Sequence, residues 1–138
     1  MTPFHLAFPV TDLEAARHFY AHLLGCPIGR TDERWIDFNF FGHQISAHLI
    51  DDKITNDPHN TVDGDRVPTR HFGAILKWDD WQNLAETLES KAYPFYIAPK
   101  VRFKGEVGEQ GTFFIKDPCQ NVLEFKTFRN MKCIFQSE

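Results

Sequence analysis

The chain has 138 residues, of which 42% are hydrophobic and 14% aromatic, and its 14 phenylalanines predict one compact domain with a Phe-rich core. Its formal net charge of −4, its pI of about 5.9 and its lack of a basic stripe argue against nucleic acid as a partner. No apolar run approaches the roughly 20 residues of a membrane-spanning helix, and no secretory signal opens the chain. The lack of such a run indicates that the protein does not bind membranes. Three widely spaced cysteines form neither a zinc pattern nor a disulfide framework, so we expect reduced thiols and a cytoplasmic protein.

The first half of the sequence predicts one helix among four strands. Apolar and other residues alternate along residues 4–10, as in a strand with one buried face. Thr11 and Asp12 are typical N-cap residues, and apolar residues at helical spacing follow them until Gly25 ends the helix. Alternation returns over residues 34–40 and 44–50, with a weaker strand near 28–31. The predicted order is β-α-β-β-β.

The second half predicts the same order of elements. We expect strands over residues 71–76, 93–98, 112–115 and 121–128, a helix that opens at Trp78, and a charged loop over 102–111. The division is a first module at about 3–51, a linker at 52–69, a second module at about 70–128 and a C-terminal extension at 129–138. The linker is either a connection or a lid over a site.

Potential metal ligands recur at matching places in the two modules. His5 and His71 head the opening strands, while His48 and Glu124 lie in the last strands. Period-two alternation points His5, His48 and Glu124 away from the helix-covered face. A glutamate between Leu123 and Phe125 is hard to explain structurally, since buried carboxylates are paired or bind metal. One metal centre shared by the two halves is therefore predicted, although each histidine alone is more often structural.

Two stretches of sequence resemble a known superfamily. Residues 4–13 (FHLAFPVTDL), followed by Phe19-Tyr20 and Leu23-Leu24-Gly25-Cys26, are similar to the opening of the vicinal oxygen chelate proteins. Residues 113–125 (FFIKDPCQNVLEF) are similar to their closing segment, with Gln120 where glycine is usual. This superfamily includes glyoxalase I, extradiol dioxygenases, and fosfomycin- and bleomycin-resistance proteins.

The resemblance implies an α+β fold of two βαβββ modules that form a curved mixed sheet around a metal. It matches His5, His71 and Glu124 to metal-ligand positions, with Glu124 also catalytic, and it leaves His48 as either a fourth ligand or a catalytic acid-base group. Three protein ligands leave three positions for a bidentate substrate and dioxygen, which favours Fe(II). Four ligands leave two positions, which suits a lyase or isomerase with Zn, Ni, Mn or Mg.

Several residues are candidates for binding a small-molecule substrate. Arg102 and Lys104 lie beside glycines and suit an anionic group, although a solvated charged loop explains them equally well. Asp37, Asn39 and Ser46 share a face with His48, and Phe114 is an aromatic candidate for the wall.

Three functions remain open at this stage. The first is a metal-dependent extradiol-type dioxygenase acting on a small aromatic or enolic substrate. The second is a glyoxalase-like lyase or isomerase with four protein ligands. The third is a metal-free protein that sequesters a small molecule, against which the four ligand-type residues argue. A homodimer is expected by analogy, with the site either within one chain or shared between two.

Overall fold

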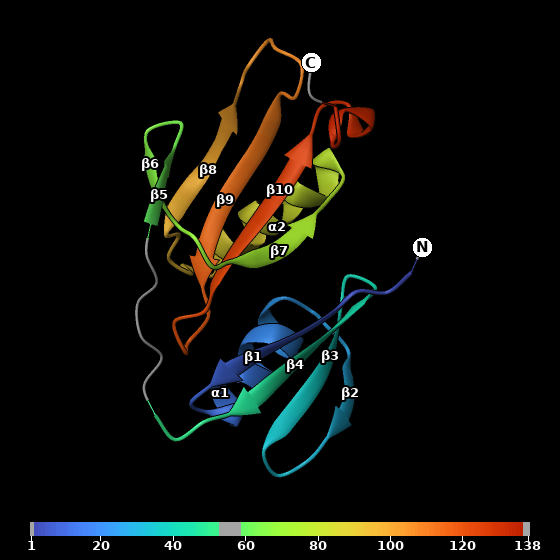
Figure 1. Cartoon of the computed structure of the whole chain (residues 1–138), viewed down its shortest axis with the longest axis vertical. Helices are drawn as coiled ribbons and strands as arrows, with labels where there is room; N and C mark the ends of the chain where they lie inside the picture. Colours follow the sequence, from blue (N-terminus) through green and yellow to red (C-terminus); the bar gives the residue numbers. More distant parts are fainter. Residues whose placement is uncertain (1, 53–58, 137–138) are drawn as a thin grey trace. The chain divides into compact units, whose positions relative to one another are not determined.

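The computed structural model describes residues 2–52 and 59–136, and each half of the chain forms a module with one four-stranded sheet (Figure 1). The chain divides into two compact units, which are described separately. Unit 1 comprises Met1–Asn56 with Asp117–Asn121, and unit 2 comprises Asp57–Lys116 with Val122–Glu138. The predicted α+β fold of two βαβββ-like modules with mixed sheets is confirmed.

Unit 1 is a mixed sheet with one helical segment. Its strands are in the order β1-β4-β3-β2; β1 and β4 are parallel, and the other pairs are antiparallel. Its elements are β1 (His5–Val10), α1 (Leu13–Arg17), the π-helix η1 (His18–Leu23), β2 (Ile28–Thr31), β3 (Trp35–Phe40) and β4 (His43–Leu49).

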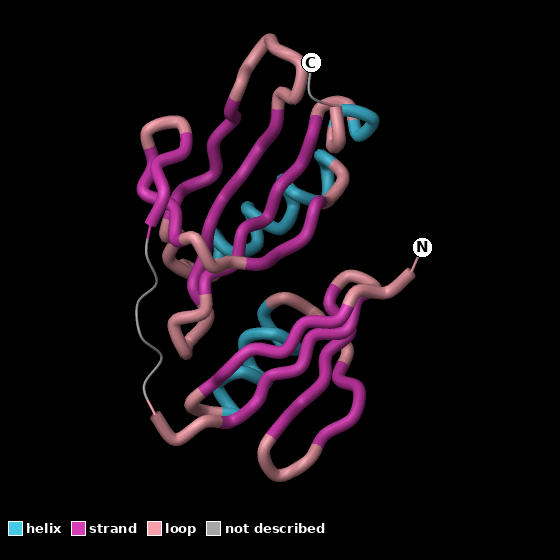
Figure 2. Tube along the Cα trace, in the orientation of Figure 1, coloured by secondary structure: helices cyan, strands magenta, loops and turns pink. Residues whose placement is uncertain are grey.

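The helical segment of unit 1 begins and packs as its sequence predicts. The Asp12 side chain accepts a hydrogen bond from the Ala15 N–H at 3.0 Å and so caps α1. The segment covers one face of the sheet (Figure 2) and buries Phe19 and Tyr20 against the apolar face that includes Phe38. The opposite face carries the candidate ligand His5.

Unit 2 repeats this sheet and adds a hairpin before it. Its sheet has the order β7-β10-β9-β8, with β7 and β10 parallel. Its elements are the hairpin strands β5 (His59–Val62) and β6 (Asp65–Pro68), then β7 (Phe72–Ile75), α2 (Trp78–Ser90), β8 (Ile97–Arg102), β9 (Gln110–Lys116), β10 (Val122–Phe128) and the 3-10 turn η2 (Met131–Cys133).

Helix α2 covers one face of the second sheet (Figure 2). The Trp81 indole N–H donates to the Phe125 carbonyl at 2.9 Å, and its ring lies 5.9 Å from that of Phe113. Leu123 and Phe125 are fully buried on the helix side. Because side chains alternate along β10, Glu124 faces the side that α2 leaves open.

The structure corrects two of the predicted elements. The strand expected at 93–98 is wrong, because β8 runs over Ile97–Arg102; the preceding Phe95 packs its ring against Phe113 instead. The predicted linker at 52–69 contains the hairpin β5–β6, while residues 53–58 of it lie outside the described residues.

The turn Asp117–Asn121 joins β9 to β10 but belongs to unit 1. Asp117 accepts a hydrogen bond from the Tyr20 hydroxyl at 2.8 Å, and the Asn121 amide donates to the Pro9 carbonyl at 2.8 Å. Burial raises the pKa of Asp117, against the effect of the hydrogen bonds that its carboxylate accepts from Asn121, Tyr20 and Cys119. Gln120, at the position where glycine is usual, has a left-handed φ of 73°. The closing motif of the sequence is thus a hydrogen-bonded turn.

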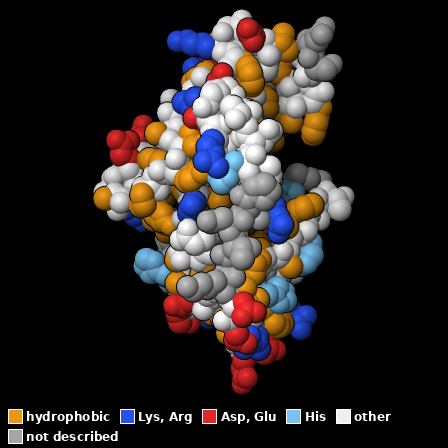
Figure 3. Space-filling model, turned by 60° about the vertical axis from the view of Figure 1, so that its left-hand side comes forward, with side chains coloured by type: hydrophobic (Ala, Val, Ile, Leu, Met, Phe, Trp, Pro, Cys, Tyr) orange, Lys and Arg blue, Asp and Glu red, His pale blue; other side chains and the backbone are white. Residues whose placement is uncertain are grey.

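The face drawn in Figure 3 carries Lys and Arg side chains at separate places, with Asp and Glu side chains on the same face. Within the described part of the chain, no helix is long and apolar enough to cross a membrane. The three cysteines are free, and burial raises the pKa of Cys26 to about 12, which makes it a poor nucleophile.

Candidate metal site

The open face of unit 2 brings His71 and Glu124 together. His71 Nε2 lies 3.2 Å from Glu124 Oε1, and the two side chains are 27% and 14% exposed. The other carboxylate oxygen, Oε2, accepts a hydrogen bond from the Thr112 hydroxyl at 2.6 Å. Burial opposes ionisation of Glu124, but the hydrogen bonds from His71 and Thr112 outweigh it and hold the pKa of the carboxyl below its usual value.

The His71 ring is fixed from its other side. Its Nδ1 lies 2.7 Å from the Pro68 carbonyl, an acceptor, so Nδ1 carries the proton and Nε2 faces the carboxylate. The edge of the Phe114 ring, 5.2 Å away, limits its rotation. The hydrogen bond to Glu124 raises the pKa of His71 above its usual value, against the effect of burial.

This pair needs a proton or a metal ion between its two members. With a neutral imidazole, the Nε2 lone pair would face a carboxylate oxygen directly, which is repulsive unless a proton or a metal ion lies there. Two adjacent ligands at about 2.1 Å from one ion are about 3 Å apart, close to the distance found between these atoms. Metal-binding histidines also commonly donate the second ring N–H to a carbonyl. The residues therefore fit a divalent metal.

A glycine allows the two strands that hold this pair to approach each other. Gly73 in β7 pairs with Glu124 in β10, two residues after His71. A Cβ at position 73 would lie 1.6 Å from the Glu124 carbonyl oxygen. Any side chain there would force the backbone at Glu124 to move, so Gly73 positions the His71–Glu124 pair.

In unit 1, a chain of hydrogen bonds fixes the ring of His5. Gln44 Oε1 lies 2.8 Å from His5 Nδ1, and Gln44 Nε2 donates to Asp37 Oδ2 at 3.4 Å. Because the Gln44 amide nitrogen donates to Asp37, the Gln44 oxygen faces the imidazole. His5 Nδ1 is therefore the donor to that oxygen. His5, like His71, is thus held through Nδ1; within residues 2–52 and 59–136 its Nε2 makes no hydrogen bond, whereas Nε2 of His71 faces Glu124. Asp37 Oδ1 also accepts from the Ser46 hydroxyl at 2.5 Å.

The strand register separates His48 from His5. His5 pairs with Gln44, whereas His48 pairs with Pro9 on β1 and with Trp35 on β3. Four residues of strand separate the two positions, which amounts to about 13 Å. His48 is exposed. It faces the same side of the sheet as His5, as alternation predicts, but at the opposite end of the strand.

The residue of unit 1 that corresponds to Glu124 is Ser46. Ser46 pairs with Ala7, two residues after His5, just as Glu124 pairs with Gly73, two residues after His71. Ser46 is 4% exposed and donates to Asp37. The repeat therefore places a hydroxyl at the position where the second unit has a carboxylate.

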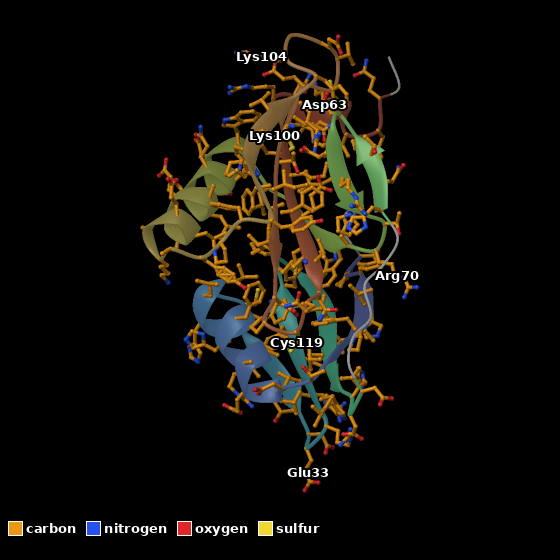
Figure 4. The ribbon with its side chains drawn as sticks, turned by 90° about the vertical axis from the view of Figure 1, so that its left-hand side faces the viewer. Glu33, Asp63, Arg70, Lys100, Lys104 and Cys119 are labelled. Carbon is orange, nitrogen blue, oxygen red and sulfur yellow. The ribbon has the colours of Figure 1, made fainter. Side chains whose placement is uncertain are left out.

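Arg102, expected to bind substrate, is engaged within unit 2. Its side chain is only 4% exposed; it donates to Asp65 at 2.7 Å and to the Val62 carbonyl at 2.9 Å. Lys100 also pairs with Asp65, at 2.9 Å. Figure 4 shows Lys100 on β8 near the hairpin that carries Asp63, and Lys104 in the loop beyond β8. The hydrogen bonds and the ion pair of Arg102 thus attach the hairpin β5–β6 to β8. Lys104 is exposed.

The other expected substrate contacts lie on the open faces of the two sheets. Phe114 is 1% exposed and packs against His71. Asn39 is exposed, and its side-chain oxygen accepts from the Gly42 N–H at 2.8 Å. Gln44, Thr112 and Gly73 are not among the site residues predicted from the sequence. Alternation with Ser46 would have placed Gln44 on the open face, but its bond to His5 depends on the register.

Among residues 2–52 and 59–136, no group of three or more His, Cys, Asp or Glu side chains is assembled around one point. The structure shows the two-residue pair of unit 2 and the single oriented imidazole of unit 1. Any larger ligand set is a matter for proposal.

Comparison with known proteins identifies the family. The family model described as "Glyoxalase/Bleomycin resistance protein/Dioxygenase superfamily" matches residues 2–125. A glyoxalase/bleomycin resistance protein/dioxygenase from Alicyclobacillus acidocaldarius is 33% identical, with 97% of this chain and 96% of that chain covered and a TM-score of 0.82. The chain therefore belongs to the glyoxalase/bleomycin resistance protein/dioxygenase superfamily, as the motifs predicted.

More distant structures share the fold. A fosfomycin resistance protein from Listeria monocytogenes is 13% identical, with coverages of 96% and 97% and a TM-score of 0.68. A lactoylglutathione lyase from Agrobacterium tumefaciens is 15% identical, with coverages of 91% and 92% and a TM-score of 0.65. A search of curated proteins finds no match.

Proposed function

We propose that this protein is a metal-dependent enzyme of the extradiol dioxygenase type, which uses dioxygen to open a small aromatic or enolic substrate. The observation that carries the proposal is the His71–Glu124 pair, in which an imidazole held through Nδ1 presents Nε2 to a carboxylate at 3.2 Å. These residues supply two members of a His/His/Glu ligand set, the type associated with Fe(II) and dioxygen.

We propose His5 as the third ligand, from the same chain or from a second copy in a homodimer. Two things support it: its position in the sequence repeat matches that of His71, and Gln44 holds its Nδ1 so that Nε2 is free. The hydrogen bond of Gln44 to Asp37 keeps the amide in this orientation. Asp37 and Gln44 are then positioning residues for His5.

We propose that His48 is not a ligand, and this favours the dioxygenase over the lyase or isomerase. His48 pairs with Pro9, and Ser46 occupies the position equivalent to Glu124. Glu124, His71 and His5 would hold the metal, and a set of three protein ligands would leave room on Fe(II) for two adjacent substrate oxygens and dioxygen. In such a reaction both oxygen atoms of O2 enter the product and one carbon–carbon bond breaks. Phe114, whose ring lies 5.2 Å from that of His71, would lie beside the substrate.

The test is anaerobic purification followed by metal analysis and oxygen uptake with catechol and 4-methylcatechol. We expect about one Fe(II) per chain and catechol-dependent oxygen consumption. Glu124→Gln and His5→Ala should each lower metal content and lower oxygen uptake by about 100-fold or more, since a missing ligand weakens both binding and orientation. His48→Ala is the matched control and should retain its metal.

Three other results would contradict the proposed dioxygenase or its metal site. Tightly bound Zn or Ni with no oxygen uptake would contradict the dioxygenase and support a lyase or isomerase. A wild type that retains no metal, and whose ligand binding is unchanged by His5→Ala, would support a sequestering protein. Full metal content in Glu124→Gln would refute the site itself.

A further inference from the structure

Unit 1 contains a cavity on the open face of its sheet. It has a volume of about 290 Å³, at the small end of the range for ligand pockets. Its walls come from the N-terminal segment, β2, β3 and the β3–β4 turn, and are formed by Pro3, Gly29, Arg30, Asp37, Phe38, Asn39, Gly42, His43 and Gln44. Gln44 also holds His5, so the cavity adjoins the proposed metal ligand.

Two ionisable side chains of opposite charge, Asp37 and Arg30, line this cavity, and only the carboxylate is engaged in hydrogen bonds. Asp37 accepts hydrogen bonds from Ser46 and Gln44 through its two oxygens. Arg30 is exposed, and within residues 2–52 and 59–136 its guanidinium has no hydrogen bond or ion pair. His43, also in the wall, accepts through Nδ1 from the Phe4 N–H at 2.7 Å. The wall thus carries a carboxylate that is already hydrogen bonded and a guanidinium whose N–H donors are available.

The neighbouring groups suit a carboxylate. Because Asn39 accepts from Gly42 through its oxygen, its amide nitrogen remains as a donor toward the cavity. A guanidinium presents paired N–H donors that match the two oxygens of a carboxylate. Pro3 and the backbone at Phe38 and Gly42 supply apolar and neutral walls for the remainder of a small ligand.

We propose that this cavity binds the carboxylate of the substrate, with Arg30 as its counter-charge and Asn39 as a second donor. That the bound carboxylate belongs to the substrate rests on the function proposed above. The preferred substrate is then a small aromatic or enolic acid whose reacting oxygens lie toward His5. Arg30 takes the role that the sequence suggested for Arg102, whose charge is used by Asp65.

The experiment uses metal-free protein, so that its outcome is independent of the metal site. Protein treated with EDTA is titrated with benzoate and with benzamide, a neutral molecule of the same shape, and backbone amide shifts are followed by NMR. We expect benzoate to shift the amides of Gly29, Asn39 and Gly42. Arg30→Gln should weaken benzoate binding about 10-fold, Arg30→Lys by less, and benzamide should bind as weakly to the wild type as to Arg30→Gln.

The matched control is Arg17→Gln, which removes the same charge from α1 outside the cavity wall and should leave benzoate binding unchanged. Equal binding of benzoate and benzamide, equal loss in Arg17→Gln and Arg30→Gln, or absence of shifts at the three cavity amides would overturn the proposal. None of these outcomes depends on whether Glu124→Gln loses metal, so the two proposals fail separately. Thermal denaturation of each variant confirms that it is folded.

Discussion

The two units present the same strand register with different chemistry. In unit 2, the position two residues beyond the histidine faces Glu124, an ionised carboxylate against His71. In unit 1, the same position faces Ser46, and the histidine is held by the neutral amide of Gln44. Unit 2 thus carries an ionisable pair that needs a proton or a metal ion between its members, whereas in unit 1 the amide of Gln44 orients one imidazole. The two units therefore share the same strand pairing but differ in the side chains that face the histidine.

The edge strands β2 and β8 each carry an arginine, and the two arginines differ in burial and in their partners. In β8, Arg102 is buried and bonded to the hairpin β5–β6, which has no counterpart in the described part of unit 1. In β2, Arg30 is exposed beside a cavity. One arginine therefore serves folding and the other is available to a ligand.

The largest expected change in stability distinguishes the parallel strand pair β7–β10 of unit 2 from the parallel pair β1–β4 of unit 1. Gly73→Ala should destabilise the protein by about 4 kcal/mol, because its Cβ would lie 1.6 Å from the Glu124 carbonyl oxygen. The equivalent change in unit 1, Ala7→Gly, removes an exposed methyl group and should cost at most about 1 kcal/mol. Chemical denaturation measures both, and similar losses would contradict the close approach of β7 and β10.

The next effect tests the two arginines. Asp65→Asn should cost about 2–3 kcal/mol, because it leaves the buried guanidinium of Arg102 without its closest carboxylate. The hydrogen bond from Lys100, with that from Arg102, lowers the pKa of Asp65. This stabilisation is therefore present at neutral pH and is lost as pH falls through the lowered pKa.

Arg30→Gln is the matched comparison and should change stability by less than about 0.5 kcal/mol. Urea unfolding at pH 7 and at about pH 2, below the lowered pKa of Asp65, gives the free energy of unfolding of both variants and of the wild type at each pH. A difference between Asp65→Asn and the wild type that does not shrink in acid would contradict this account.

A smaller effect concerns the orientation of His5. Asp37→Asn should cost about 1–2 kcal/mol, since a charged acceptor of two hydrogen bonds is lost. It should also mix the tautomers of His5, because an amide at position 37 no longer fixes the direction of Gln44. Imidazole nitrogen NMR shifts detect this. Ser46→Ala removes one of the two bonds and should leave the His5 tautomer unchanged; a mixed tautomer in that control would contradict the chain.

The smallest effect compares the turns that join the last two strands of each module. The β3–β4 turn contains Gly42 at φ 90°, whereas the β9–β10 turn holds Gln120 at φ 73°. Gln120→Gly should stabilise the protein by about 0.5–1 kcal/mol, because a side chain disfavours this conformation. Gln120→Ala keeps the strain and should give no gain in thermal unfolding; a gain equal to that of the glycine variant would exclude backbone strain as the cause.

Sequence patterns were sufficient for the fold and for the faces of the strands. Period-two alternation correctly placed Glu124 opposite Leu123 and Phe125, and the repeat of βαβββ elements is confirmed. The same patterns could not give the register between β1 and β4, because alternation is unchanged when a strand slides by two residues. Hence alternation alone makes His48 and Ser46 equally good candidates for the position that corresponds to Glu124. Only the strand pairing, of His48 with Pro9 and of Ser46 with Ala7, distinguishes them.

Long-range pairing explains the remaining differences. Arg102 looked available because its partner Asp65 is 37 residues away, in a segment read as a linker. The hairpin around Asp63 and Gly64 has the typical residues of a tight turn, yet its short polar strands show little alternation. The aromatic residues before β8 resembled a strand, but Phe95 uses its ring for packing against Phe113.

The turn Asp117–Asn121 also bears on how the chain is made. Unit 1 includes these five residues, although most of it lies within Met1–Asn56. During synthesis the first module leaves the ribosome long before Asp117, the acceptor of the buried Tyr20 hydroxyl, exists. Its native set of hydrogen bonds is therefore completed only when nearly the whole chain has been translated, and a gene fragment ending in the linker would encode an unfinished unit.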